Sequence, residues 1–263
     1  MNTQNSTIEI LNNRRSIRLY KNEPITTEER QTILHATMRA PTAGNMMLYS
    51  VLEITDQIIK EQLAQSCDNQ PFIAKAPWVL IFLADYQRWM DYFTYSGVEE
   101  KAVELQRQTR LPGEGDLMLA ICDALIAAQT AVIAAESLGI GSCYIGDIIE
   151  QYEFHRDLLK LPRYVFPITM ICFGKSAKED PDWKLQPRFP QQYIVHQNQY
   201  RPLLKEKIAD FEKPLVERTY PTGKFPPGID NLAQRYYFHK FAVDFSKEMT
   251  RSVRELLKNW QAA

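Results

Sequence analysis

The distribution of apolar and polar positions predicts strands that alternate with helices along the first two thirds of the chain. Short apolar runs predict three strands, at residues 49–54, 78–84 and 165–173. Helical spacing and end signals predict a short helix opening at Ile8, a helix between Thr26 and Pro41, and helices over 56–67 and 151–160. The helix after Thr26 begins with a capping box, because Glu29 follows Thr26 by three residues.

Residues 117–138 are apolar on nearly every side. A helix of this kind is typically buried in a core or in a subunit interface. Gly139 follows it as a C-terminal cap. The segment is long enough to span a bilayer, but Asp123, Gln129 and Glu136 interrupt it, so we do not expect a membrane protein.

The last third of the chain has a different composition. Residues 175–202 are rich in proline, glutamine and charge, which predicts a long excursion without packed elements. Helical patterns then return over about 203–212 and about 230–259, and the second of these carries one apolar stripe that ends at Trp260.

Charge and cysteine usage exclude several classes of function. The 263 residues include 31 basic and 32 acidic side chains, so the chain has no overall attraction for nucleic acid or an anionic membrane. Its four cysteines form no Cys-x-x-Cys pair and no histidine stands at metal-ligand spacing, so no metal site is expected. The polar start, Met1 to Glu9, lacks the apolar core of a secretion signal. We expect a reduced, cytoplasmic setting.

Three short motifs carry candidate chemistry. The first motif contains Arg14, Arg15 and Arg18 around Ser16. The second, at 186–190, contains Arg188, and the third, at 139–146, contains several glycines. Guanidinium groups bind phosphate through paired donors, and glycines let a backbone approach a flat ligand. These motifs together suggest a flat, phosphorylated cofactor. The alternatives are a solvated helix face for the arginines and a helix cap for Ser16. The glycine motif follows a predicted helix and lacks a third glycine, so a Rossmann site is not expected.

In order and spacing, five fragments resemble the nitroreductase family of FMN-dependent oxidoreductases, in its longer, NADPH-preferring branch. The fragments are Arg14-Arg15-Ser16-Ile17-Arg18, Ala40-Pro41-Thr42-Ala43-Gly44-Asn45, Asn69-Gln70-Pro71-Phe72, residues 134–146, and residues 186–200 beginning with Gln186-Pro187-Arg188. The resemblance implies a phosphate and ribityl role for the first fragment, with Arg188 as the second phosphate contact. It implies that Gln70 meets the pyrimidine edge of FMN, and that Tyr144, Ile145 and Gly146 lie under its N5 edge. Thr42, Ala43, Gly44 and Asn45 are expected to reach the cofactor from a partner subunit.

The resemblance also implies a fold and an assembly. We expect an α+β fold in which a mixed sheet is flanked by helices, within an intertwined homodimer that holds two FMN sites at its interface. Residues 1–263 would then form one domain, with 175–263 as an excursion and C-terminal arm over the partner.

The expected reaction is ping-pong hydride transfer. NADPH, in preference to NADH, would reduce FMN, and a nitroaromatic, a quinone or free flavin would then take the electrons at the same open face. No catalytic side chain is needed, because the cofactor carries the chemistry. Arg18 or Gln70 would stabilise charge on the reduced ring.

Three departures from the family pattern leave alternatives open. Met47 stands where the family often has Gln, Gln186 where it often has Lys, and Asp147 where it often has Gly. The alternatives are another flavin reaction, such as reductive dehalogenation or flavin fragmentation, and a flavin-binding protein without catalysis. The aromatic segment Tyr86 to Tyr95 is either a core helix or a substrate lid, and Tyr144 packs either on the flavin or in the core.

Overall fold

A computed structural model of the protein describes residues 6–178 and 185–261. They form two compact units, the first of Met1–Glu179 with Glu248–Ala263 and the second of Asp180–Lys247. Six residues of the predicted excursion, 179–184, lie outside the described part of the chain. The first five residues of the predicted polar start lie outside it as well.

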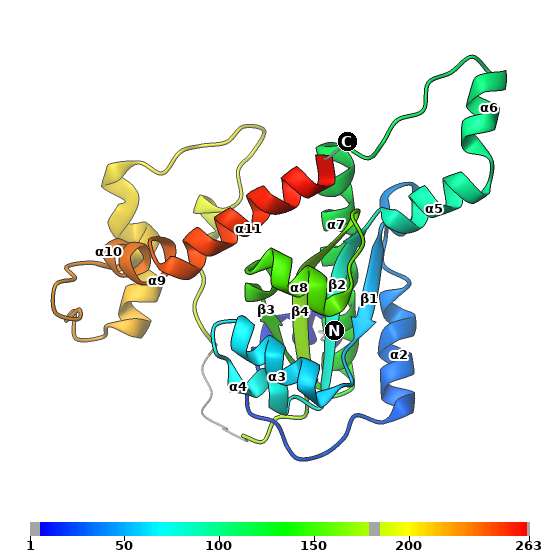
Figure 1. Ribbon diagram of the computed structural model, residues 1–263. Coiled ribbons are helices and arrows are strands. Elements are labelled where there is room, and N and C mark those ends of the chain that lie inside the picture. The colour runs from blue at the N-terminus through cyan, green and yellow to red at the C-terminus, as the bar shows by residue number, and fades with distance from the viewer. Residues whose placement is uncertain (1–5, 179–184, 262–263) are drawn as a thin grey trace, which may run out of the picture. The chain divides into compact units, whose positions relative to one another are not determined.

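A four-stranded sheet is the centre of the first unit (Figure 1). Its strands are β1 (Tyr49–Glu53), β2 (Trp78–Asp85), β3 (Gly141–Ile145) and β4 (Val165–Gly174), in the order β1-β2-β4-β3. All three strand pairs are antiparallel, and the parallel pairing expected of a mixed sheet is limited, among the described residues, to an isolated bridge between Ser16 and Ser142. The predicted α+β class is confirmed, with every residue of β2 and β4 buried.

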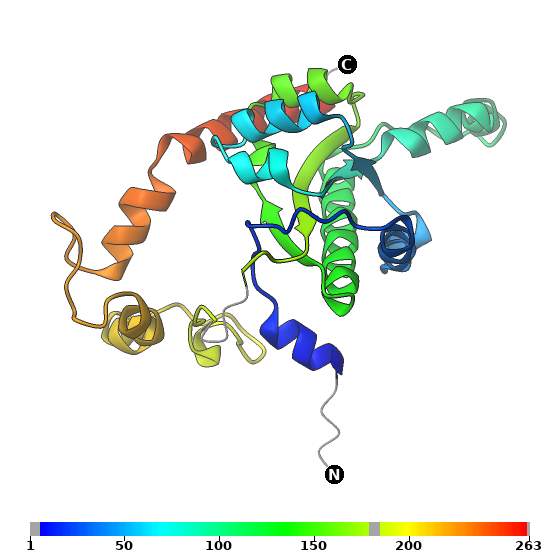
Figure 2. The same cartoon turned by 90° about the horizontal axis from the view of Figure 1, so that it is seen from below.

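Helices cover both faces of this sheet, and the side chains of β2 alternate between them. Trp78, Leu80 and Phe82 join a core with α7 (Glu114–Ser137) and α2 (Thr27–Thr37). The intervening residues of β2 face α3 (Gln57–Ser66), α4 (Pro71–Lys75) and α8 (Tyr152–Leu159). The result is a three-layer arrangement, which Figure 2 shows edge-on.

Small side chains allow α7 to lie close against the sheet. Its fully buried positions include six alanines, at residues 120, 124, 127, 128, 131 and 135. By length and composition α7 could cross a membrane, yet 44% of its most apolar stretch is buried inside the protein. A core helix passes the same test, so this is weak evidence for a membrane span.

Several predicted end signals are confirmed. Thr26 and Glu29 exchange hydrogen bonds at the start of α2, with the Glu29 N–H donating to Thr26 Oγ1 at 3.2 Å and the Thr26 N–H to Glu29 Oε2 at 2.7 Å. Gly139 follows α7 with a φ of 71°, a left-handed conformation that favours glycine.

Two predictions about secondary structure are wrong. No strand was predicted between residues 139 and 151, but residues 141–145 form the edge strand β3; five residues that begin with a glycine give too little pattern to identify a strand. The single helix expected over about 230–259 is broken into α10 (Leu232–Tyr236), a π-helical turn (Tyr237–Phe241) and α11 (Asp244–Gln261).

The remaining described elements are short or lie at the margins. They are α1 (Ser6–Asn13), α5 (Gln87–Tyr95), α6 (Val98–Glu104) and α9 (Ile208–Thr219), with 3₁₀ turns at Ala43–Asn45, Asp147–Ile149, Gln191–Tyr193 and Lys205–Lys207. The end of α11 packs on the first unit of its own chain, where Leu256 and Trp260 are buried and the Trp260 Nε1–H donates to the Pro112 carbonyl at 3.0 Å.

Candidate functional site

The arginine motif runs in extended form beside the edge strand β3. The Ile17 N–H donates to the Ser142 carbonyl at 2.9 Å, next to the Ser16–Ser142 bridge. This close approach depends on Gly141, because a Cβ at that position would lie 2.4 Å from Ile17 Cγ1. The fold thus brings two of the predicted motifs together from positions more than a hundred residues apart.

The arginine side chains of this motif lie near three different elements. Burial raises the pKa of Glu136, near the end of α7, to about 6, and the charges of Arg14 and Arg15 partly offset that rise. Burial likewise raises the pKa of the Cys143 thiol in β3, and Arg18 is the first of the groups that oppose the rise. The Arg18 guanidinium also lies 5.8 Å from the centre of the Phe72 ring in α4.

The Gln70 side chain contacts the turn that follows β3, as expected if both segments bind the same cofactor. Its Nε2 donates to Asp147 Oδ2 at 2.7 Å and to the Cys67 carbonyl at 2.9 Å. Asp147 therefore points toward Gln70 and is part of the candidate site. In the sequence, Asp147 is notable only as a departure from the family pattern.

A buried carboxyl group lies beside this pair. Glu150 is 5% exposed, and its Oε1 has no hydrogen-bond partner among the described residues. Burial raises its pKa to about 7, and the nearby charges of Asp147 and Asp68 contribute to that rise.

Tyr144, Ile145 and Gly146, the three residues expected under the N5 edge of FMN, differ in how a ligand can reach them. Gly146 is exposed, and a Cβ built on it meets nothing within 4 Å, so open space adjoins its backbone. Ile145 is 2% exposed, which leaves only its backbone for a ligand. Tyr144 is half-buried and donates from its hydroxyl to Gln129 Oε1 of α7 at 3.1 Å, and burial raises its pKa to about 12. Within one chain, Tyr144 packs against the core.

The loop that holds Thr42, Ala43, Gly44 and Asn45 is fixed by one buried carboxylate. Asp123 of α7, 2% exposed, accepts the N–H of Ala43 at 2.9 Å and the N–H of Leu48 at 3.0 Å. Sequence reasoning treated Asp123 only as an interruption of an apolar segment. An acidic residue in the middle of a buried helix was the signal that pointed to such a role, because a buried carboxylate needs donors.

One chain does not bring this loop to the arginine motif. The loop is attached to α7 at Asp123, whereas Arg14 and Arg15 lie near Glu136 of the same helix. These positions are 13 residues apart, which is about 20 Å along a helix axis.

The aromatic segment after β2 forms α5 and supports the same loop. The Trp89 Nε1–H donates to the Met46 carbonyl at 2.7 Å, and Arg88 donates to the carbonyls of Met47 and Tyr49. The outer tyrosines of α5 are exposed, at 59% for Tyr92 and 84% for Tyr95. One face of the helix is thus structural, and the lid interpretation stays a prediction for the other face.

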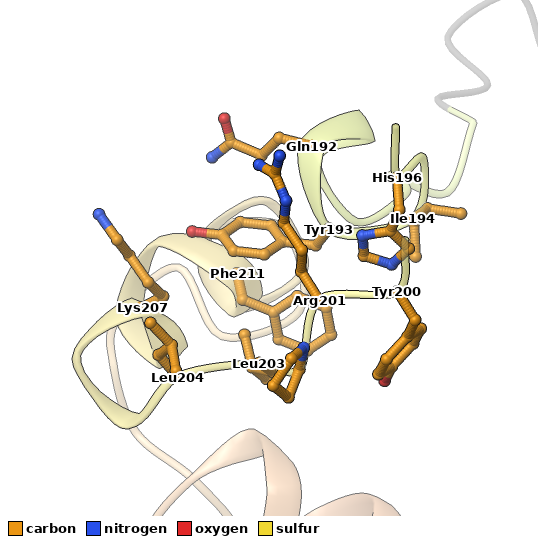
Figure 3. A pocket seen from close by; sticks show the side chains of 11 residues that line it. Gln192, Tyr193, Ile194, His196, Tyr200, Arg201, Leu203, Leu204, Lys207 and Phe211 are labelled. Carbon is orange, nitrogen blue, oxygen red and sulfur yellow. The ribbon is translucent and has the colours of Figure 1, made fainter. Parts of the chain in front are cut away.

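Arg188 belongs to the second unit, where Phe189 stacks on Phe211 with ring centres 4.0 Å apart. This unit contains a pocket of about 510 Å³, none of whose lining residues is among the predicted cofactor contacts. Figure 3 shows its aromatic and basic walls, with the long Arg201 side chain extending past Tyr193 toward Gln192.

Comparison with known proteins identifies the family. The nitroreductase family pattern matches residues 11–175. The chain is 34% identical to an oxygen-insensitive NADPH nitroreductase of Salmonella typhimurium, over 80% of this chain and 81% of that protein. It is 33% identical to an FMN reductase (NADPH) of Bacillus subtilis, over 74% and 75% of the two chains.

Solved structures agree over nearly the whole length. NfrA2 of B. megaterium superposes with a TM-score of 0.78 at 27% identity, covering 98% of both chains. The NADPH:FMN oxidoreductase of Vibrio harveyi, solved in complex with NAD+, gives a TM-score of 0.76 at 28% identity, covering 96% of this chain and 98% of that one. The chain therefore belongs to the nitroreductase family.

Proposed function

We propose that this protein is an FMN-dependent oxidoreductase that uses NAD(P)H, with NADPH favoured, to reduce nitroaromatics, quinones or free flavin. The names of its relatives, an NADPH nitroreductase and an FMN reductase, support this activity. The single observation that carries it is the meeting of the arginine motif, Gln70 and the open backbone of Gly146 around edge strand β3.

These residues fit FMN in charge and in shape. Arg14, Arg15 and Arg18, with the Ser16 hydroxyl, form a cationic segment suited to a phosphate and its ribityl chain. Gln70 offers a fixed amide group for the pyrimidine edge, and the open space at Gly146 admits a flat ring. Arg188 is proposed as a second phosphate contact. Bound FMN supplies the capacity to accept a hydride from NADPH and pass two electrons on, so the protein has only to bind, orient and shield.

The proposed enzyme is a homodimer with shared sites. The separation of about 20 Å along α7 between the 42–45 loop and the arginine motif supports a loop that serves the site of the partner subunit. Helix α7 also has an exposed apolar face on the first unit. Four outward apolar side chains of α7 are exposed: Met118 60%, Leu119 49%, Leu125 43% and Ile126 40%. A homodimer would bury this face.

Other expectations from the sequence remain part of this proposal. They are a cytoplasmic location, a single domain over 1–263, and an arm that reaches over the partner subunit. The arm was expected over 175–263, but the end of α11 packs on its own chain, so we limit the proposed arm to the described residues 185–247 of the second unit.

The test of this proposal is the cofactor itself. The purified protein should be yellow, and denaturation should release FMN at about one per chain. Arg18→Ala and Arg188→Ala should each weaken FMN binding by about one to two decades, the effect of one charge-assisted hydrogen bond. Arg39→Ala, outside the predicted motifs, is the matched control. A colourless protein that takes up no added FMN would reject the function. A yellow protein that NADPH does not reduce would indicate a flavin-binding protein without catalysis.

A further inference from the structure

The Gln70 side chain has only one possible amide orientation. Both of its hydrogen-bond partners, the Asp147 carboxylate and the Cys67 carbonyl, are acceptors. The nitrogen must therefore face them, and both of its hydrogens are used. Gln70 therefore has no hydrogen left for the donor role toward the reduced ring that the sequence suggested, and Arg18 remains the candidate for that role. The carbonyl oxygen, Oε1, accepts no hydrogen bond from the described residues and is the atom left for a ligand.

The backbone fixes both ends of this contact. Asp68 and Asn69 take left-handed conformations, with φ of 57° and 48°, and the Gln70 N–H donates to the Ala64 carbonyl at 2.8 Å. On the other side, Asp147 opens a 3₁₀ turn in which its carbonyl accepts the Glu150 N–H at 3.0 Å. The contact at 2.7 Å thus joins two defined turns.

The charge of Asp147 is not neutralised within the chain. Among residues 6–178 and 185–261, no lysine or arginine forms an ion pair with its carboxylate. Its charge also acts on the buried Glu150, whose pKa it helps to raise. Within the described residues, the Asp147 carboxylate thus has no ion-pair partner and lies directly against the amide group that faces the ligand.

We propose that Asp147 is a positioning residue of the cofactor site, which turns the Gln70 carbonyl oxygen toward FMN and biases the site toward oxidised over reduced FMN. The inference rests on the proposed function. An acceptor at this point matches the N3–H donor of the pyrimidine edge. Two-electron reduction places more negative charge on the ring, and a nearby carboxylate disfavours that increase.

Two substitutions separate the two roles of this side chain. Asp147→Asn keeps an oxygen that accepts from Gln70 and removes the charge. Asp147→Ala removes both the acceptor and the charge. Asp68→Asn is the matched control for charge, because Asp68 is exposed, lies two residues from Gln70 and forms no hydrogen bond with it, and asparagine tolerates its left-handed conformation.

The measurements are the FMN dissociation constant of apoprotein and the equilibrium midpoint potential of bound FMN against a reference dye. In Asp147→Asn, we expect binding of reduced relative to oxidised FMN to rise about tenfold, or about 30 mV for a two-electron couple. Asp68→Asn should leave this ratio within about twofold, because an exposed charge is screened by solvent. Asp147→Ala should weaken binding of oxidised FMN about fivefold, the effect of one neutral hydrogen bond.

A double-mutant cycle tests whether Asp147 acts through Gln70. In a Gln70→Ala background, Asp147→Ala should cause no further loss of affinity for oxidised FMN. Additive losses would overturn the positioning role, and equal potential shifts in Asp147→Asn and Asp68→Asn would overturn the specific charge effect. Circular dichroism and thermal unfolding show whether each variant folds. If Asp147→Ala does not fold, the more conservative Asp147→Asn still tests the effect of the charge. If the wild-type protein binds no FMN, it is the proposed function that fails, and that result is distinct from either outcome above.

Discussion

The carboxylate of Asp123 accepts the backbone N–H of Ala43 at 2.9 Å, which ties the loop expected to serve a partner's cofactor to the centre of α7. The second oxygen accepts the N–H of Leu48 at 3.0 Å, so the group spans both sides of the loop. The helix whose exposed apolar face is proposed to be buried in the homodimer therefore also sets the position of the loop.

We expect Asp123→Asn to lower the free energy of unfolding by about 1–3 kcal/mol. Asparagine has only one oxygen to offer, so one buried N–H loses its acceptor. Urea unfolding measures the change. Asp91→Asn, an exposed carboxylate in α5, is the control and should stay within about 0.5 kcal/mol of wild type. Equal urea midpoints for Asp123→Asn and wild type would contradict the anchoring role.

Gly141→Ala should be destabilising by about 1–3 kcal/mol, because the new Cβ would overlap Ile17 Cγ1 at 2.4 Å. The arginine motif would be displaced from β3, so FMN affinity should fall as well. Adding Ile17→Ala should recover part of the loss, which a double-mutant cycle detects as coupling. Gly115→Ala, where nothing lies within 4 Å, is the matched control and should be neutral or stabilising. An additive double mutant would mean that this contact does not set the motif's position.

The stability of the protein should depend on the ionisation of Glu150. Its pKa in the folded state is about 7, above the ordinary value of 4.5, chiefly because the group is buried. The folded state therefore keeps a proton that the unfolded state has lost between these values, so stability falls as pH rises from about 4.5 to about 7.

Glu150→Gln should remove this part of the pH dependence. We expect the variant to match wild type near pH 4 and to exceed it by about 1–3 kcal/mol near pH 8, as measured by urea unfolding at both values. A constant difference between the two proteins across this range would show that folding does not change the pKa of Glu150.

A mixed dimer tests the shared site. Arg18→Ala removes a proposed phosphate contact, and Asn45→Gly removes a loop side chain while tolerating its φ of 58°. Each homodimer should bind FMN weakly. A heterodimer of the two variants should contain one intact site, with Arg18 from one subunit and Asn45 from the other.

Differently tagged chains allow this heterodimer to be purified and titrated with FMN. The shared site predicts one tight site per two chains. Two weak sites per heterodimer would place the whole site within a single chain, and so would a stable, FMN-loaded monomer.

Local sequence signals were sufficient for much of the fold. The capping box of Thr26 and Glu29, the glycine after α7 and the apolar runs of β2 and β4 are encoded by neighbouring residues, and each forms as expected. Edge strand β3 was missed, because its identity comes from pairing with β4 and with the segment around Ser16 rather than from its own five residues.

The sequence predicted the separate motifs of the candidate site but not the contacts between them. The motif order placed Gln70 and the turn after β3 near one ligand, but no local pattern links Gln70 with Asp147, 77 positions later. The same is true of Asp123 and Ala43, which lie 80 positions apart. Such contacts depend on tertiary packing, and they determine how the site is held.

The central claim is that the protein transfers electrons from NADPH to an acceptor through bound FMN. Anaerobic stopped-flow absorbance tests it most directly. NADPH alone should bleach the visible flavin band, and a quinone or nitroaromatic added after removal of the nucleotide should restore it. This order of events predicts parallel initial-rate plots. A flavin band that NADPH leaves unchanged, or that returns only when NADPH and acceptor are bound together, would contradict the account.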